Sequence, residues 1–220
     1  MTHSLTVILW AVVGAGGGWL VRWGSVRLAR LEGLEPDSKP WQVYGPPIVG
    51  AAVLAVFALV VTPFPLLVVR SIFALVLVQV IFFDFEYRLI LDRVIFPSMA
   101  LALLVTLSPL VSSRAGLWFQ PWWLGIVMGL IAGAMFLILA LIGAVIFKAE
   151  ALGFGDVKLA AFMGLLLGWP YTFTALFYGA FLAVIGVIVF AVRNRSLKGT
   201  IAYGPYLAGG ALIVLLSPLS

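Results

Sequence analysis

Two short polar islands carry the residues of this chain that could do chemistry. In the first, Gly153-Phe154-Gly155-Asp156-Val157-Lys158, an aspartate preceded by two glycines stands immediately before an apolar segment. The second island runs from Asp84 to Asp92 and follows an earlier apolar segment. Ionisable residues at membrane depth are costly and are usually functional. We therefore expect Asp84 and Asp156 to form one catalytic site.

The rest of the inventory of reactive side chains is small. The sequence has no cysteine, a single histidine (His3) near the N-terminus, and eight carboxylates. The lack of cysteine excludes disulfides, thiolate zinc sites and a cysteine nucleophile. Two carboxylates brought close together cannot both ionise easily, so one of them keeps its proton. Such a pair can activate water against a peptide bond, and we expect no metal and no cofactor.

Each aspartate also has a purely structural interpretation, which the sequence leaves open. Asp84, Arg88 and Asp92 are spaced four residues apart, so a continuous helix would place them on one face, where they could pair. Asp156 could be the N-cap of the helix that follows, because an aspartate carboxylate accepts hydrogen bonds from the free amide groups at a helix start. The glycines before it would then only permit the turn.

The composition indicates that lipid is the solvent of this chain. Of the 220 residues, 64% are hydrophobic and 10% are charged, and the mean hydropathy is +1.22. Soluble domains contain roughly 45–50% apolar and about 25% charged residues. The sequence therefore predicts an all-α protein, a polytopic bundle of about eight transmembrane helices. We expect one integral membrane domain over residues 1–220.

Apolar segments of roughly 17–25 residues can cross a bilayer as helices. The first predicted span is expected to remain in the membrane, because no signal-peptide cleavage pattern accompanies it. Residues 22–45 are predicted to form a short cytoplasmic loop, and residues 84–93 and 147–158 the cytoplasmic catalytic segments. The predicted spans are 5–21, 46–61, 66–83, 94–111, 123–147, 157–168, 171–192 and 201–216.

The charges predict the orientation. Lysine and arginine accumulate in the cytoplasmic loops of membrane proteins, and eleven of the thirteen present here fall in every second loop between the predicted spans or, for Lys158, at the start of the span that follows such a loop. All eight acidic residues lie on that same side. This pattern places both termini outside and the two polar islands at the cytoplasmic face. It also accounts for the net charge of +5 without a nucleic-acid partner, which we do not expect.

Two features inside the spans have structural interpretations. Gly125, Gly129 and Gly133 recur every four residues, a spacing that lets helices approach closely in lipid. We expect them to form a helix-packing face. Arg70 lies inside the third predicted span, and we expect its guanidinium to snorkel toward the outer face of the membrane.

The two islands also resemble a known family. The motif Gly153-x-Gly155-Asp156-x-Lys158-Leu159 is similar to the GxGD motif of intramembrane aspartyl proteases. Glu150 and the small residues after Leu159 are similar to one branch of that group, the type IV prepilin leader peptidases. Two further segments resemble the first aspartate segment and the C-terminal Phe-Gly-Pro segment of that family; they are Asp84-x5-Ile90-Leu91-Asp92-x3-Phe96-Pro97 and Tyr203-Gly204-Pro205-Tyr206-Leu207-Ala208.

The resemblance implies a membrane aspartic endopeptidase of the bacterial plasma (inner) membrane. Such enzymes cleave the basic leader of type IV prepilins and pseudopilins, the subunits of type IV pili and type II secretion systems. The two catalytic aspartates of the family correspond to Asp84 and Asp156. The expected partners are the leader peptide and membrane lipid, and the oligomeric state is not indicated. Residues expected to bind substrate or support the site are Gly153, Gly155, Lys158, Glu150 and Asp92.

One segment departs from the family pattern. Many members N-methylate the new N-terminus, and members typically carry a large cytoplasmic segment between the first two spans, with two CxxC pairs that bind zinc. Here that segment is residues 22–45, which are few and contain no cysteine. Zinc binding by that route is excluded, and N-methylation of the product is called into question.

Two other classes of function also fit paired acids in a membrane bundle. One is a small transporter or channel whose acids relay protons or bind cations. The other is a non-catalytic membrane subunit of a pilus or secretion assembly. Asparagine at Asp84 or Asp156 would abolish ion flux in the first case and would be tolerated in the second.

Overall fold

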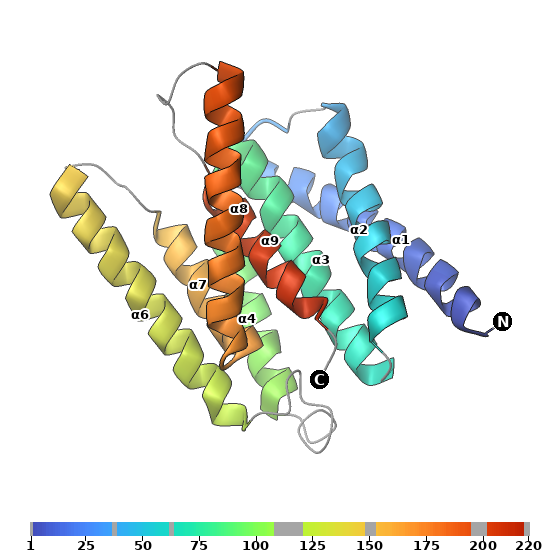
Figure 1. The fold of residues 1–220 in the computed structure, drawn as a ribbon. Coiled ribbons are helices and arrows are strands. Elements are labelled where there is room, and N and C mark those ends of the chain that lie inside the picture. The colour runs from blue at the N-terminus through green and yellow to red at the C-terminus, as the bar shows by residue number, and fades with distance from the viewer. Residues whose placement is uncertain are drawn as a thin grey trace. The chain divides into compact units, whose positions relative to one another are not determined.

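The computed structural model describes residues 2–36, 39–61, 64–107, 121–147, 153–194 and 202–217 (Figure 1). Within these ranges the chain forms eight α-helices and no strand. The predicted all-α fold class and helical bundle are therefore confirmed. The helices are α1 (Thr2–Leu31), α2 (Pro40–Val60), α3 (Phe64–Tyr87), α4 (Asp92–Leu107), α6 (Trp122–Phe147), α7 (Phe154–Leu167), α8 (Tyr171–Asn194) and α9 (Gly204–Leu215).

The helices differ in their ability to span a bilayer. In the described part of the chain, five are long and apolar enough to cross a membrane, and these are α1, α2, α3, α6 and α8. The helices α4, α7 and α9 have 16, 14 and 12 residues and coincide with three other predicted spans. Packing divides the chain into two compact units, Met1–Arg88 with Leu215–Ser220, and Leu89–Val214.

Glycines set the spacing between α1 and α2 in the first unit. A methyl group on Gly14 would collide with the carbonyl group of Gly50, and one on Gly18 would collide with the carbonyl group of Pro46. The two helix backbones can approach this closely only because these positions lack side chains. No hydrophobic effect drives helices together in lipid, so this dispersion contact is a main source of their association.

The helix α3 is joined to both neighbours by aromatic side chains. The indole Nε1 of Trp10 in α1 donates a hydrogen bond to Oγ of Ser71 in α3, at 2.9 Å. The rings of Trp41 in α2 and Phe82 in α3 stack with their centroids 6.1 Å apart. A broad apolar ring suits tryptophan to both positions, and at Trp10 the indole N–H also finds a hydrogen-bond partner.

The segment 22–45, predicted to be a loop, is largely helical. Helix α1 continues past its predicted end at Val21 to Leu31, and α2 begins at Pro40 rather than at Pro46. Proline is favoured in the first turn of a helix because its missing N–H would have no partner there. The backbone N–H of Lys39 also donates to Oε1 of Gln42, at 3.2 Å, which closes the start of α2.

Arg70 does not snorkel, contrary to the prediction. Its side chain is fully buried, and its Nη1 donates to the backbone carbonyl oxygens of Leu215 at 2.9 Å and Ser217 at 3.0 Å. The last carbonyl groups of a helix have no partner within that helix and carry partial negative charge. A buried guanidinium therefore caps the end of α9, where Leu215 is the last residue.

Helix α7 is the core of the second unit. Ten of its 14 residues are buried, and α4, α6 and α8 pack around it. The glycine face predicted on α6 is confirmed, because a methyl group on Gly125 would lie 2.7 Å from the carbonyl oxygen of Leu165, and one on Gly129 would lie 3.0 Å from that of Ala161. Helix α7, which packs closely against α6, carries Asp156 in its first turn.

Candidate active site

Asp156 lies at the start of α7, ahead of the apolar residues 157–168. Gly153 is the N-cap of the helix, so Asp156 occupies the N3 position. The Asp156 N–H donates to the carbonyl oxygen of Gly153 at 3.0 Å, and the Asp156 carboxylate accepts a hydrogen bond from the Gly153 backbone. The interpretation of Asp156 as the N-cap is therefore wrong in position, although its carboxylate does close the first turn, as an acid at N3 can.

Burial sets the acidity of Asp156. The residue is only 8% exposed, and loss of hydration raises the pKa of its carboxyl group from 3.8 to about 6. The hydrogen bond from Gly153 acts in the opposite direction and is the smaller effect. A carboxyl group with a pKa this close to neutrality can both hold and release a proton under physiological conditions, as a general acid or base requires.

The two glycines of the motif have different roles. A methyl group on Gly155 would lie 2.9 Å from Cβ of Ile90, which is closer than side-chain carbon atoms normally approach. Ile90 therefore packs directly against the first turn of α7. A methyl group on Gly153 would lie 3.6 Å from Oδ2 of Asp156, an ordinary contact, and the φ of −72° at Gly153 is open to any residue.

Gly155→Ala is expected to impair the site more than Gly153→Ala. The new methyl group must push either the first turn of α7 or Ile90 aside, and a displacement of about 1 Å can cost about 100-fold in rate. The measurement is the initial rate of leader cleavage by each variant at equal amounts of membrane-inserted protein. Equal rates for the two alanine variants would show that the contact with Ile90 does not position Asp156.

Asp84 lies in the last turns of α3 and is 4% exposed. The interpretation of Asp84, Arg88 and Asp92 as a ladder on one helix is wrong. Helix α3 ends at Tyr87, Arg88 adopts a positive φ of 54°, and a new helix begins at Asp92. A carboxyl group buried at the end of an apolar helix is costly to desolvate, so its presence favours a functional role. Asp84 belongs to the first unit and Asp156 to the second, and their pairing stays a prediction.

Three of the predicted supporting residues lie near Asp156 in the second unit. Gly153 and Gly155 lie in the turn that begins α7, and Lys158 lies two residues after Asp156 in the same helix. The Lys158 ammonium does not reach back to Asp156 but forms an ion pair with Oδ1 of Asp92, at 2.6 Å. Glu150, the remaining predicted supporting residue, lies outside the described residues.

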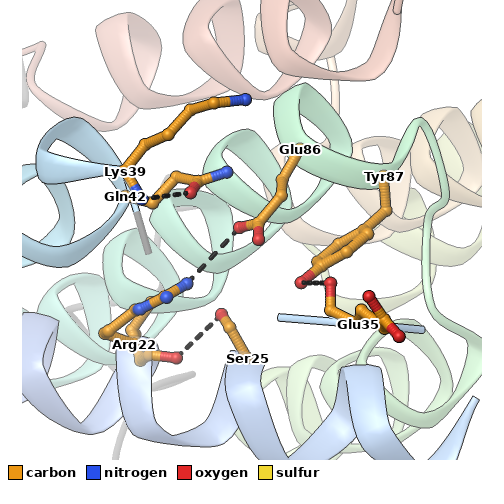
Figure 2. A network of polar contacts seen from close by, with 8 residues as sticks. Arg22, Ser25, Glu35, Lys39, Gln42, Glu86 and Tyr87 are labelled. Carbon is orange, nitrogen blue, oxygen red and sulfur yellow. Dashed lines mark hydrogen bonds and ion pairs between the residues drawn. The ribbon is translucent and has the colours of Figure 1, made fainter. Parts of the chain in front are cut away.

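A polar network joins α1 to the end of α3 in the first unit (Figure 2). Nη1 of Arg22 lies 3.4 Å from Oε2 of Glu86, and the Tyr87 hydroxyl donates to the backbone carbonyl oxygen of Glu35 at 3.4 Å. Glu86 stands two residues after Asp84, and its side chain is almost completely buried. We therefore assign Glu86 to holding the end of α3 rather than to chemistry.

The sequence interpretation did not single out Tyr203 as a site residue. Tyr203 directly precedes α9, its ring lies 6.3 Å from that of Phe136, and it lies near enough to Asp156 to interact with the charge of that carboxylate. The sequence signal that could have identified Tyr203 was the segment Tyr203–Ala208, which resembles the C-terminal Phe-Gly-Pro segment of the family. In the ranges that the structure describes, no group of three or more His, Asp or Glu residues could hold a metal ion.

Comparison with known proteins decides the family. A model described as the type IV leader peptidase family matches residues 71–188, which are 118 of the 220 residues and include both Asp84 and Asp156. The chain belongs to the type IV leader peptidase family. The matched region of this leader peptidase family member begins within α3 and ends within α8.

The curated relatives carry the name prepilin leader peptidase/N-methyltransferase. The protein from Pseudomonas putida is 30% identical over 145 residues, which cover 60% of this chain and 44% of that relative. The proteins from Pseudomonas aeruginosa and Aeromonas salmonicida are 40% and 37% identical over 68 residues, covering 30% of this chain and 23% of each relative. The alignments therefore cover less than half the length of these relatives. No solved structure matches the chain.

Proposed function

We propose that this chain is a membrane aspartic endopeptidase that cleaves the basic leader peptide of type IV prepilins and pseudopilins. The observation that carries the proposal is the buried carboxyl group of Asp156, with a pKa of about 6, in the Gly153-x-Gly155-Asp156 motif. Family membership and the printed names of the relatives supply the substrate class. The proposed acid–base chemistry of peptide hydrolysis follows from the Asp156 carboxyl group.

The proposed mechanism uses Asp84 and Asp156 as a pair that shares one proton. The ionised carboxylate accepts a proton from water, and the resulting hydroxide attacks the scissile carbonyl carbon. The protonated carboxyl group donates a hydrogen bond to the carbonyl oxygen, which stabilises the negative charge that develops there. Collapse of the tetrahedral intermediate then breaks the C–N bond, and the departing amine takes up the proton that came from water.

The proposed site faces the cytoplasm of a bacterium from its plasma (inner) membrane, with both termini outside. The distribution of basic residues along the chain supports this orientation. A basic leader on the cytoplasmic side would meet Asp92 and Glu150, the two acids predicted to support the site, on the same side. N-methylation of the cleaved product is not part of the proposal, because residues 22–45 contain no cysteine pairs.

The test uses the purified chain in detergent with a purified type IV prepilin. Mass measurement of the prepilin before and after incubation reports loss of the leader, and an added methyl group would report transferase activity. Cleavage at a single site after the basic leader supports the proposal. An intact prepilin under conditions in which an established leader peptidase processes it would overturn the proposal.

The same preparation separates the two rival functions. A transporter or channel with paired acids would carry protons or cations across liposomes and leave the prepilin intact. A non-catalytic subunit of a pilus or secretion assembly would show neither activity.

A further inference from the structure

Four side chains form a cluster between α4 and α7 at the end that carries Asp156. Asp92 and Phe96 are one helical turn apart in α4, and Phe154 and Lys158 are one turn apart in α7. Nζ of Lys158 lies 2.6 Å from Oδ1 of Asp92, 4.9 Å from the ring centre of Phe154 and 5.4 Å from that of Phe96. Each helix thus contributes one charged and one aromatic residue around the same ammonium group.

The geometry does not fit a lysine that extends into the lipid headgroups. The Lys158 side chain is 19% exposed, whereas the Asp92 carboxylate is 54% exposed. The ammonium is less exposed than its partner and lies near two aromatic rings, which are themselves 53% (Phe96) and 63% (Phe154) exposed. A cation over an aromatic face is attracted by the ring quadrupole even at an exposed site. The cluster therefore holds the ammonium in one place, which an exposed ion pair alone does poorly.

The position of the cluster connects it to the site. Lys158 is two residues after Asp156 in the same turn of α7, and Asp92 is two residues after Ile90. Ile90 is the residue against which Gly155 packs. The first turn of α7 is therefore held against residues 90–92 at two points, by the contact of Gly155 with Ile90 and by the ion pair of Lys158 with Asp92.

We infer that Asp92, Phe96, Phe154 and Lys158 form a latch that fixes the first turn of α7 and so positions the carboxyl group of Asp156. Lys158 acts through Asp92 and does not touch the reacting atoms, so it is a positioning residue. The inference rests on the proposed peptidase function for its effect on rate, but the latch itself can be observed without any activity.

The first experiment measures the latch directly. Hydrogen exchange of the backbone amides, followed by mass spectrometry in detergent, is compared for the native chain, Lys158→Met and Asp92→Asn. Asparagine keeps the length of aspartate, methionine is one atom shorter than lysine, and each substitution removes one charge. Peptides that cover residues 153–158 and 89–92 are expected to exchange at least about tenfold faster in both variants, because local opening becomes easier, while peptides from α6 and α8 remain unchanged.

The matched control is Arg27→Gln. The guanidinium of Arg27 also lies over an aromatic ring, 5.1 Å from the centre of Trp23, but it belongs to α1 in the first unit. Its substitution removes a cation–aromatic contact without touching the latch. Unchanged exchange in residues 153–158 of Lys158→Met would overturn the latch whether or not the chain is a peptidase.

The second experiment measures leader cleavage. Lys158→Met and Asp92→Asn are each expected to lower kcat by about 10- to 100-fold with KM changed less than about twofold, because substrate still binds and only the alignment of Asp156 is lost. The double variant is expected to lose no more than either single variant, and the exchanged pair Asp92→Lys with Lys158→Asp is expected to recover part of kcat.

The outcomes separate the two proposals. Faster exchange in residues 153–158 with an unchanged kcat would show that the pair only stabilises the helix, which overturns the positioning role. Multiplicative losses in the double variant would show that the two residues act independently, which also overturns it. A native chain that cleaves no prepilin but still shows the exchange difference would overturn the proposed function and leave the latch standing.

Discussion

Asp156→Asn and Asp84→Asn are each expected to lower the rate of leader cleavage by a factor of about 100 to 10,000. Asparagine has nearly the shape of aspartate but can neither accept nor release the proton that the proposed mechanism moves. The substitutions introduce no charge, so insertion into the membrane should be unaffected. The measurement is the initial rate of cleavage of a purified prepilin, normalised to the amount of folded protein.

The control for these variants is Glu32→Gln, which neutralises an exposed carboxylate on the same predicted side of the membrane. Its rate should equal that of the native chain. If either aspartate variant kept full activity, the two-aspartate mechanism would be excluded. If only one of the two lost activity, that residue alone would carry the acid–base chemistry.

Asp156→Asn is also expected to change how stability depends on pH. The Asp156 carboxyl group has a pKa of about 6 in the folded protein, against 3.8 when exposed. Between these values the folded state binds more protons than the unfolded state, so the free energy of unfolding falls as the pH rises from about 4 to about 6. The difference between the two pKa values corresponds to a loss of at most about 3 kcal/mol in the free energy of unfolding.

Asparagine cannot ionise, so the variant should lack this loss of stability. The expected result is that Asp156→Asn unfolds at a higher temperature than the native chain at pH 7 to 8 and at a similar temperature near pH 4. Thermal unfolding in detergent across this pH range is the measurement, with Glu32→Gln as the control. Parallel curves for Asp156→Asn and the native chain would contradict a folded-state pKa near 6. A more stable Asp156→Asn variant would show that the ionisable carboxyl group lowers the stability of the native chain at neutral pH, a common pattern at active sites.

Apolar runs were enough to locate every helix that the structure describes. The glycine spacing on α6 was enough to identify its packing face, because both signals are local properties of sequence. The ends of α1 and α2 were not predictable in this way. Helix α1 extends through a polar segment because Ser25 and Ala29 are buried there and Arg22 meets Glu86 of α3, and a hydropathy pattern does not report such contacts.

The site residues likewise divide into features that the sequence predicts and features that depend on the folded structure. The motif identified Asp156 and its glycines, but the N3 position of Asp156 depends on where the helix begins, and the ends of helices are weakly encoded. The partner of Lys158 is 66 residues away in the chain, so spacing along the sequence could not indicate it. The turn at Arg88, which ends the helix that carries Asp84, has a positive φ at a residue type that rarely adopts one.

The hydrogen bonds of Arg70 also constrain how the protein is made. The carbonyl groups that receive this guanidinium belong to residues 145 and 147 positions later in the chain. While the ribosome is still synthesising the intervening helices, α3 already carries a cation for which these two acceptors do not yet exist. A charge inside a bilayer is costly without partners, so other protein groups, lipid headgroups or water must solvate Arg70 during this interval. Once α9 is complete, the carbonyl groups of Leu215 and Ser217 replace these temporary partners. The hydrogen bonds of Arg70 are therefore expected to form late in the folding of the first unit.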